Sequence, residues 1–299
     1  MKQILVIGVA LSFAAPFAAF GQSLSFTSKD PNKPIQVTAD QGIEWQQTDK
    51  RFIARGNAKA TQGDINVTAD ELTAHYRETK SGATEVYRVD AIGRVTIASK
   101  DETASGAAAV YDFDKEVLVI EGSPVTLSTP TGKVTAQQAI QYWSKEKVAV
   151  AEGDAEAQDE TRDIKADKLT AFFAEAKPGA DKSSMRQGDI RLVVANGNVL
   201  LRTEKETARG DRGEYNRETG IAKIEGKVSL TQGQNQAQGG FAVIDTKAGT
   251  SRLFGSAAEA KTSSPGNNTR VKALIAPKPQ ATPTPSQWAS PAKKDAEKR

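Results

Sequence analysis

The chain has 299 residues, of which 38% are hydrophobic and only 6% aromatic, so it can bury a substantial core, and an extended core fits this composition better than a compact globule. Its 40 basic and 37 acidic residues nearly cancel, which predicts no strong surface field and argues against nucleic acid as a partner. The chain contains no cysteine, which excludes disulfides and thiolate-bound zinc or iron–sulfur sites.

The first 21 residues have the pattern of a cleavable export signal. Lys2 precedes a short apolar run that Pro16 interrupts, and Ala19-Phe20-Gly21 places small residues at the −3 and −1 positions of a cleavage site. The alternative is a retained membrane anchor, but the apolar run is short for a membrane span. We therefore predict cleavage before Gln22.

From Ile35 to about Phe254, apolar and polar residues alternate in short runs. In the segment Phe52–Asp70, for example, the runs are separated by Gly56-Asn57 and Gly63-Asp64, which predicts strand, turn, strand, turn. Such turn signals recur every eight to twelve residues, and no helical pattern lies between them. The sequence therefore predicts an all-β fold.

A longer sequence repeat is superimposed on the strand pattern. Four residues recur 104 positions later: Gly93, Glu102, Tyr111 and Gly122 correspond to Gly197, Glu206, Tyr215 and Gly226. Several matches at one offset indicate a duplicated body, and a fixed period favours an elongated stack of units. We predict a flexible leader at 22–33, a first copy at 34–160 and a second copy at 161–260 that continues the same sheets. Residues 261–299, rich in Pro, Ala and Lys, are predicted to be a disordered tail.

The residues that might support catalysis do not form a convergent set. The single histidine, His75, corresponds to Phe172 in the second copy, which favours a packing or surface role. Asp40, Asp70 and Asp167 recur at the predicted strand ends, where each is expected to open a turn by bonding backbone amides. The sequence therefore predicts no enzyme activity, no metal and no cofactor. The alternative is a carboxylate-dependent enzyme that acts on polysaccharides from a β-solenoid.

One side of each predicted strand is apolar. The positions on that side include Ile35, Val37, Ile65, Val67, Ile97, Tyr111 and Phe113. Two sheets that face each other with these residues inward would enclose a long apolar slot. Alternation alone does not separate a lipid-holding cleft from the filled core of a purely structural repeat protein, so both interpretations stay open here.

A series of short motifs follows a fixed order in the first copy. They are Pro34–Asp40, Phe52–Asn57, Thr61–Gly63, Ile65–Asp70 and the spaced set Gly106, Tyr111 and Val117–Gly122. Across about residues 34–150 these motifs resemble the OstA-like family of periplasmic lipopolysaccharide transport proteins, and residues 164–254 resemble the same domain more distantly. The resemblance implies an elongated, open, twisted β-jellyroll whose two sheets splay apart.

The resemblance also implies a function for the slot. It implies a periplasmic carrier that binds lipopolysaccharide, shields the lipid A acyl chains and bridges the inner and outer membranes. The lipid-facing positions of the family fall on Ile35, Val37, Ile97, Tyr111 and Phe113, and Ile65 and Val67 share their apolar side. The implied partners are an inner-membrane lipopolysaccharide extraction complex with its anchored periplasmic component, an outer-membrane lipopolysaccharide translocon, and further copies of the chain stacked head to tail.

Overall fold

The computed structural model describes residues 35–80, 82–174, 190–262 and 270–275. The predicted export signal at 1–21, the leader at 22–33 and the part of the predicted tail beyond residue 275 lie outside the described residues.

In these ranges the chain forms eighteen strands and one short helix. The strands of the first copy and of the junction are β1 (Gln36–Thr38), β2 (Ile43–Gln46), β3 (Arg51–Gln62), β4 (Ile65–Glu78), β5 (Thr84–Ala98), β6 (Thr103–Asp112), β7 (Val117–Glu121), β8 (Val125–Thr129), β9 (Gly132–Ala136) and β10 (Ala139–Trp143). The remaining elements are β11 (Val148–Asp159), β12 (Arg162–Phe173), β13 (Ile190–Thr203), β14 (Thr207–Asn216), β15 (Ile221–Gln232), β16 (Asn235–Asp245), β17 (Thr250–Phe254), α1 (Ala257–Thr262) and β18 (Lys272–Leu274).

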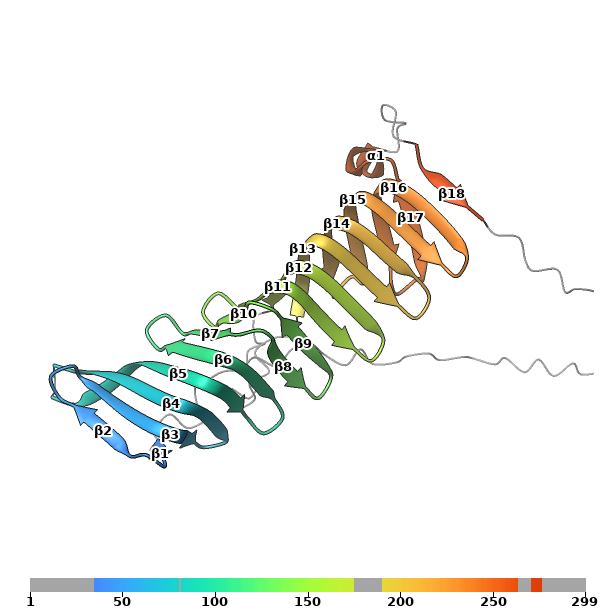
Figure 1. The fold of residues 1–299 in the computed structure, drawn as a ribbon. Coiled ribbons are helices and arrows are strands. Elements are labelled where there is room, and N and C mark those ends of the chain that lie inside the picture. The colour runs from blue at the N-terminus through green and yellow to red at the C-terminus, as the bar shows by residue number, and fades with distance from the viewer. Residues whose placement is uncertain (1–34, 81, 175–189, 263–269, 276–299) are drawn as a thin grey trace, which may run out of the picture.

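The strands follow one another along the long axis of an elongated molecule (Figure 1), with β1 and β2 at one end and β17 and β18 at the other. All pairings are antiparallel, and each long strand contributes one half to each of two sheets. Sheet 1 begins with β2 paired to the first half of β3 and ends with β17 on β16. Sheet 2 begins with β1 paired to the second half of β3 and ends with β18 on β16. The elongated, duplicated all-β jellyroll predicted from the sequence is confirmed.

The two sheets join along a line of β-bulges, which we call the seam. In β3 the register shifts between Arg55 and Ala58, and the intervening Gly56 and Asn57 have positive φ angles of 76° and 42°. The same pair of left-handed residues recurs at Gly93-Arg94, Gly153-Asp154, Gly197-Asn198 and Gly226-Lys227. A bulge adds one residue to one strand and bends it, so the apolar side faces inward both before and after the bend.

The seam corrects one prediction from the sequence. Gly63-Asp64 is the predicted turn between β3 and β4, whereas Gly56-Asn57, also predicted as a turn, lies inside β3. A glycine followed by a residue with positive φ is typical of a tight turn and also of a bulge. The strands are consequently longer than predicted.

Two of the recurring aspartates, Asp70 and Asp167, form contacts at the seam. Asp70 lies inside β4 and Asp167 inside β12, so the prediction that they open turns is wrong. The Asp70 carboxylate lies so close over Gly93 that a Cβ there would overlap it, and Arg94 Nε donates to Asp70 Oδ1 at 2.8 Å. Asp167 lies over Gly197 in the same way, with Asn198 Nδ2 donating to it at 2.9 Å. These carboxylates hold adjacent strands together at the bend.

Beyond residue 260 the structure contains more regular structure than the predicted tail. α1 ends at Thr262, and β18 pairs with the sheet 2 half of β16. The strand is only three residues long, too short for alternation to reveal it, and the short apolar run around it lies between polar and Pro-rich segments. In the described ranges no helix is long and apolar enough to cross a membrane.

We expect Gly93→Ala to destabilise the protein by about 2 kcal/mol or more, because alanine disfavours positive φ and its Cβ would displace the Asp70 carboxylate. The measurement is the urea-unfolding midpoint followed by circular dichroism. Gly82→Ala is the matched control, since Gly82 also has positive φ but open space around its Cβ position. Equal losses in the two variants would mean that the contact with Asp70 contributes nothing.

Candidate functional site

The predicted slot positions of the first copy lie between the two sheets. Ile65, Val67, Ile97 and Tyr111 are buried there, and Phe113 packs against them as a partly buried residue. The rings of Tyr111 and Phe113 meet edge to face with centroids 4.7 Å apart. Burial raises the pKa of Tyr111 to about 12, so its hydroxyl stays neutral at physiological pH. In this part of the molecule the predicted positions therefore form a packed apolar interior.

Ile35 and Val37, the other two predicted positions, lie at the open N-terminal end. They are 47% and 38% exposed, although Val37 is opposite Ala60 and therefore on the inner side of sheet 2. Two residues of β2 that the prediction omitted have the same character: Ile43 and Trp45 are 53% and 57% exposed on the inner side of sheet 1. The alternation Ile43-Glu-Trp45 is the signal that would have identified them. These side chains are exposed because, within the part of the chain that the structure describes, no further strand covers them.

Aromatic residues organise this N-terminal end. The Trp45 ring stacks on Phe52 with centroids 5.4 Å apart, and Phe52 contacts Tyr76 at 5.1 Å. Trp45 Nε1 also donates a hydrogen bond to the Tyr76 hydroxyl at 2.8 Å. The exposed indole is therefore held in a fixed position at the mouth of the slot.

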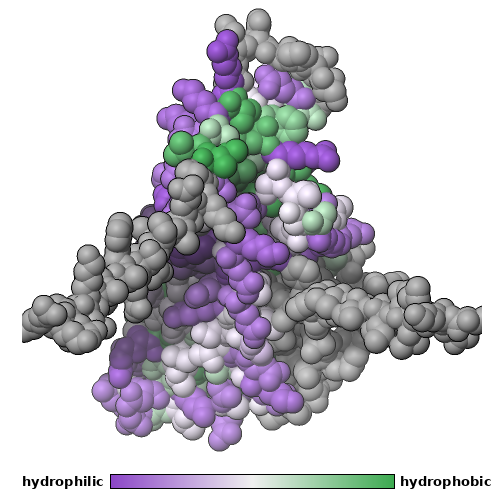
Figure 2. Space-filling model, turned by 90° about the vertical axis from the view of Figure 1, so that its right-hand side faces the viewer, coloured by the Kyte–Doolittle hydropathy of each residue, from purple (hydrophilic) through white to green (hydrophobic). Residues whose placement is uncertain are grey.

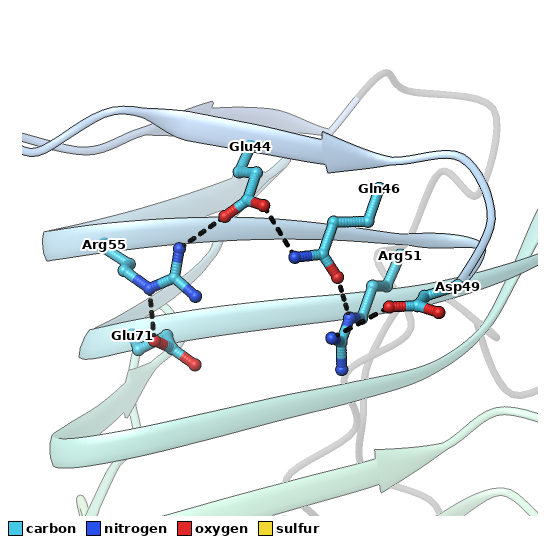
Figure 3. A network of polar contacts seen from close by, with 6 residues as sticks. All are labelled: Glu44, Gln46, Asp49, Arg51, Arg55 and Glu71. Atoms are coloured by element: carbon cyan, nitrogen blue, oxygen red, sulfur yellow. Dashed lines mark hydrogen bonds and ion pairs between the residues drawn. The ribbon is translucent and has the colours of Figure 1, made fainter.

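The outer side of the same strands is polar (Figure 3). Arg55 joins three strands by donating to Glu44 of β2 at 2.8 Å and to Glu71 of β4 at 2.9 Å. Hydrogen bonds from Gln46 and then from Arg55 lower the pKa of Glu44. Water screens these exposed pairs and leaves them little effect on stability, so the network mainly ensures that β2 presents its charged side to water and its apolar side to the slot.

The C-terminal end also exposes apolar residues, namely Val271, Leu274 and Ile275 around β18. Figure 2 shows apolar surface gathered near the top of this end. α1 packs there against β16 and β17, and Ser256 and Glu259 form a capping arrangement in which Glu259 accepts from Gly255 N at 3.0 Å. Of the eight large hydrophobic residues exposed in the described ranges, seven lie at the two ends, and Ile92 is the other.

His75, the only histidine of the chain, lies within a polar surface cluster. Its Nε2 atom is 2.7 Å from Asp90 Oδ2, and Arg88 Nε donates to the other Asp90 oxygen at 2.8 Å. Among the described residues, no group of three metal-binding side chains comes together. Asp70 and Asp167 belong to separate positions along the seam and do not face each other as a carboxylate pair.

Two equivalent glutamates differ between the copies. Glu102, in the hairpin between β5 and β6, is 4% exposed, and neither carboxylate oxygen has a hydrogen-bond partner. Burial, with a smaller effect from Asp101, raises the pKa of Glu102 to about 7. Glu206, 104 residues later, instead accepts a hydrogen bond from Ser251 Oγ at 3.0 Å.

We expect Glu102→Gln to remove a pH dependence of stability. The folded state holds the Glu102 proton up to about pH 7, while the unfolded chain releases it near pH 4.5, so wild-type stability falls as pH rises between these values and stays lower above them. At pH 8 the variant should be more stable by on the order of 2 kcal/mol, and near pH 4 the difference should vanish. Urea unfolding at both pH values measures this.

Glu206→Gln provides the control, because it should show no such gain at pH 8. A Glu102→Gln variant with the same pH profile as the wild type would contradict the burial of an ionisable carboxyl at this position.

Together, the fold and the slot define a protein class: an open β-jellyroll with a polar outer surface, an apolar interior and apolar side chains exposed at both ends. The chain belongs to the LptA/(LptD N-terminal domain) LPS transport protein family, whose profile matches it twice, over residues 36–142 and 133–250. The resemblance to OstA-like lipopolysaccharide transport proteins is thereby confirmed.

The solved structures that are similar to the chain include one from a periplasmic transport system. It is the crystal structure of LptH from Pseudomonas aeruginosa, described as the LptA-homologous periplasmic component of the conserved lipopolysaccharide transport device. The two chains share 16% sequence identity over 83% of this chain and 99% of that one, with a TM-score of 0.20. A comparison with curated proteins gave no match.

Proposed function

We propose that the protein is a periplasmic lipopolysaccharide carrier that shields lipid A acyl chains between its two sheets and forms part of a bridge from the inner to the outer membrane. The observation that carries this proposal is the placement of exposed apolar residues. Ile35, Val37, Ile43 and Trp45 continue the inner apolar side beyond the packed interior to an uncovered end. A core that is completely filled by its own side chains would not account for exposed apolar residues at its open end.

The energetics of the cargo favour such a slot. A dozen-carbon acyl chain that moves from an apolar environment into water costs on the order of 10 kcal/mol, at about 0.8 kcal/mol per methylene. A lipid with several acyl chains therefore needs continuous shielding while it crosses an aqueous compartment. Shielding requires apolar side chains along a path and no catalytic group.

The two ends are suited to different partners. Within the described residues, β2 and β1 leave one pair of strand edges unpaired, and β17 and β18 leave another, so contact between unlike ends would extend the sheets from chain to chain. We infer that one end receives lipid from the inner-membrane extraction complex through its anchored periplasmic component. The other end would deliver it to the outer-membrane translocon, directly or through further copies of the chain stacked head to tail.

A purely structural role is the second candidate. It is favoured by the burial of Ile65, Val67, Ile97 and Tyr111, which fill the interior of the first copy. For the carrier to work there, the sheets must separate or these side chains must move aside. The polysaccharide enzyme has no comparable support, because Asp70 and Asp167 are engaged at the seam.

Photo-crosslinking distinguishes these roles. We expect a photoreactive residue at Ile35 or Phe113 to label bound lipopolysaccharide in the purified protein, because both positions belong to the inner side. Ile92 is the matched control, since it is a large exposed apolar residue away from both ends. Absence of labelling at both slot positions in a folded protein, or equal labelling at Ile92, would favour the structural role.

A further inference from the structure

Four strand positions in the described chain are divided into two short strands, one in each sheet. At the two ends, β2 and β1 pair with the halves of β3, and β17 and β18 pair with the halves of β16. In the middle of the molecule (Figure 1), β7 and β8 pair with the halves of β6, and β10 and β9 pair with the halves of β11. Two divided strands therefore adjoin there, and we call β7–β10 the junction.

The divided strand β9/β10 repeats β1/β2 in detail. In both places a glutamine side chain lies so close over the glycine of the next bulge that a Cβ there would overlap it: Gln41 over Gly56, and Gln138 over Gly153. The backbone N–H of Gln41 donates to the strand beside it at 2.9 Å, and that of Gln138 does so at 3.0 Å. The two matches of the family profile begin at residues 36 and 133, the same distance apart as the two glutamines. The fold therefore starts a second time at β9.

The two divided strands differ in what covers them. At the open N-terminal end Ile43 and Trp45 of β2 are 53% and 57% exposed, whereas their counterparts in β10, Ile140 and Tyr142, are 7% and 6% exposed. β10 is covered because β7 pairs with it along five residues in sheet 1, while β8 pairs with β9 along five residues in sheet 2. The junction therefore buries the apolar side chains that the free end leaves in water.

The other side of the junction resembles the C-terminal end of the described chain. β7 runs along β6 from the free edge of sheet 1 to the seam, and the chain then returns along sheet 2 as β8. β17 and β18 follow the same course on β16, with α1 in the segment between them. The junction thus joins an edge of the C-terminal kind to an edge of the N-terminal kind.

The free ends carry complementary charges in the register of the junction. In the junction Val119, the third residue of β7, is opposite Gln141 of β10. The corresponding residues at the free ends are Arg252, the third residue of β17, and Glu44 of β2. Opposite charges would face each other there in place of the neutral pair, which supports a docking role for edges of this design.

We propose that the described residues of 35–129 and of 132–275 form two docking units, and that the junction is an end-to-end interface retained within one chain. Each unit begins and ends with a divided strand. The partner that fits the β7/β8 edge is the N-terminal edge of another such unit, which β9 and β10 of the same chain supply. The unit boundary lies in the hairpin between β8 and β9 and not at residue 160, where the sequence predicts that the copies meet. If the proposed function holds, on which this consequence rests, one chain spans the distance of two docked carriers.

The test begins with the full chain carrying one protease site in the hairpin at 129–132. The matched control carries the same site in the hairpin at 159–162, which also lies at the free edge of sheet 2. After cleavage, the fragments are separated in urea, returned to buffer singly and then mixed. We expect both fragments of the first chain to regain the circular-dichroism signal of β-structure alone, and to form a one-to-one complex in size-exclusion chromatography after mixing.

The control cut should behave differently. It separates β11 from β12, two undivided strands that pair along nine residues, and leaves the apolar side of both sheets uncovered along full-length strands. We expect at least one of its fragments to stay unfolded alone. Recovery of both control fragments alone, or failure of either fragment of the first chain to recover alone, would overturn the assignment of the units.

A substitution in β10 tests the interface itself. In the cleaved first chain, Ile140→Asp should weaken recombination at least about tenfold, because it places a charge where β7 covers an apolar side chain. Ile92→Asp is the control, since Ile92 is 58% exposed and away from the junction, and it should leave recombination unchanged.

Undiminished recombination of the Ile140→Asp fragments would also overturn the docking interface, and the comparison of the two cuts does not depend on this variant. These experiments contain no lipid, so their failure leaves the carrier proposal in place. Absence of crosslinking at Ile35 and Phe113 would in turn overturn the carrier and leave the two units unaffected.

Discussion

The seam of glycine bulges is the constraint on which the rest of the structure depends. At each bend a glycine and the residue after it adopt positive φ, and the strand passes from sheet 1 to sheet 2 without losing the inward direction of its apolar side. Without the added residue, simple alternation would turn the same side chains outward in one of the sheets. The aspartates over Gly93 and Gly197 require glycine there, since any Cβ would overlap their carboxylates.

From this constraint follows an interior that is long and narrow and has two ends. Strands added along the axis extend both sheets at once, so nothing in the repeat closes the molecule. The end strands consequently carry inner-side residues such as Val37 and Trp45 that, within the described ranges, no further strand covers. In a closed barrel these residues would be buried. Here they leave apolar surface at each end, the kind of surface that marks an interaction site.

Much of this architecture can be predicted from the sequence, and the failures have physical causes. Alternation over segments such as Ile65–Asp70 identifies strands and their inner side, and the 104-residue offset identifies the duplication. Alternation does not distinguish a bulge from a turn, because Gly56-Asn57 and Gly63-Asp64 satisfy the same local preferences. Only the pairing of β3 with β4 on both sides of Gly56-Asn57 makes it a bulge.

The candidate site, too, can be predicted only in part from the sequence. Sequence periodicity places Tyr111 and Phe113 on the inner side, but it contains no information on how fully neighbouring side chains occupy the space. That depends on pairs brought together across strands, such as Tyr111 with Leu118 and Tyr215 with Ala222. Because the two copies share the same sheets, a well-packed interior in one copy stabilises the sheets of both. The other copy can then lose buried side-chain volume while the fold remains stable. A leucine in one copy and an alanine in the other therefore give a repeated fold two sections whose interiors are filled to different extents.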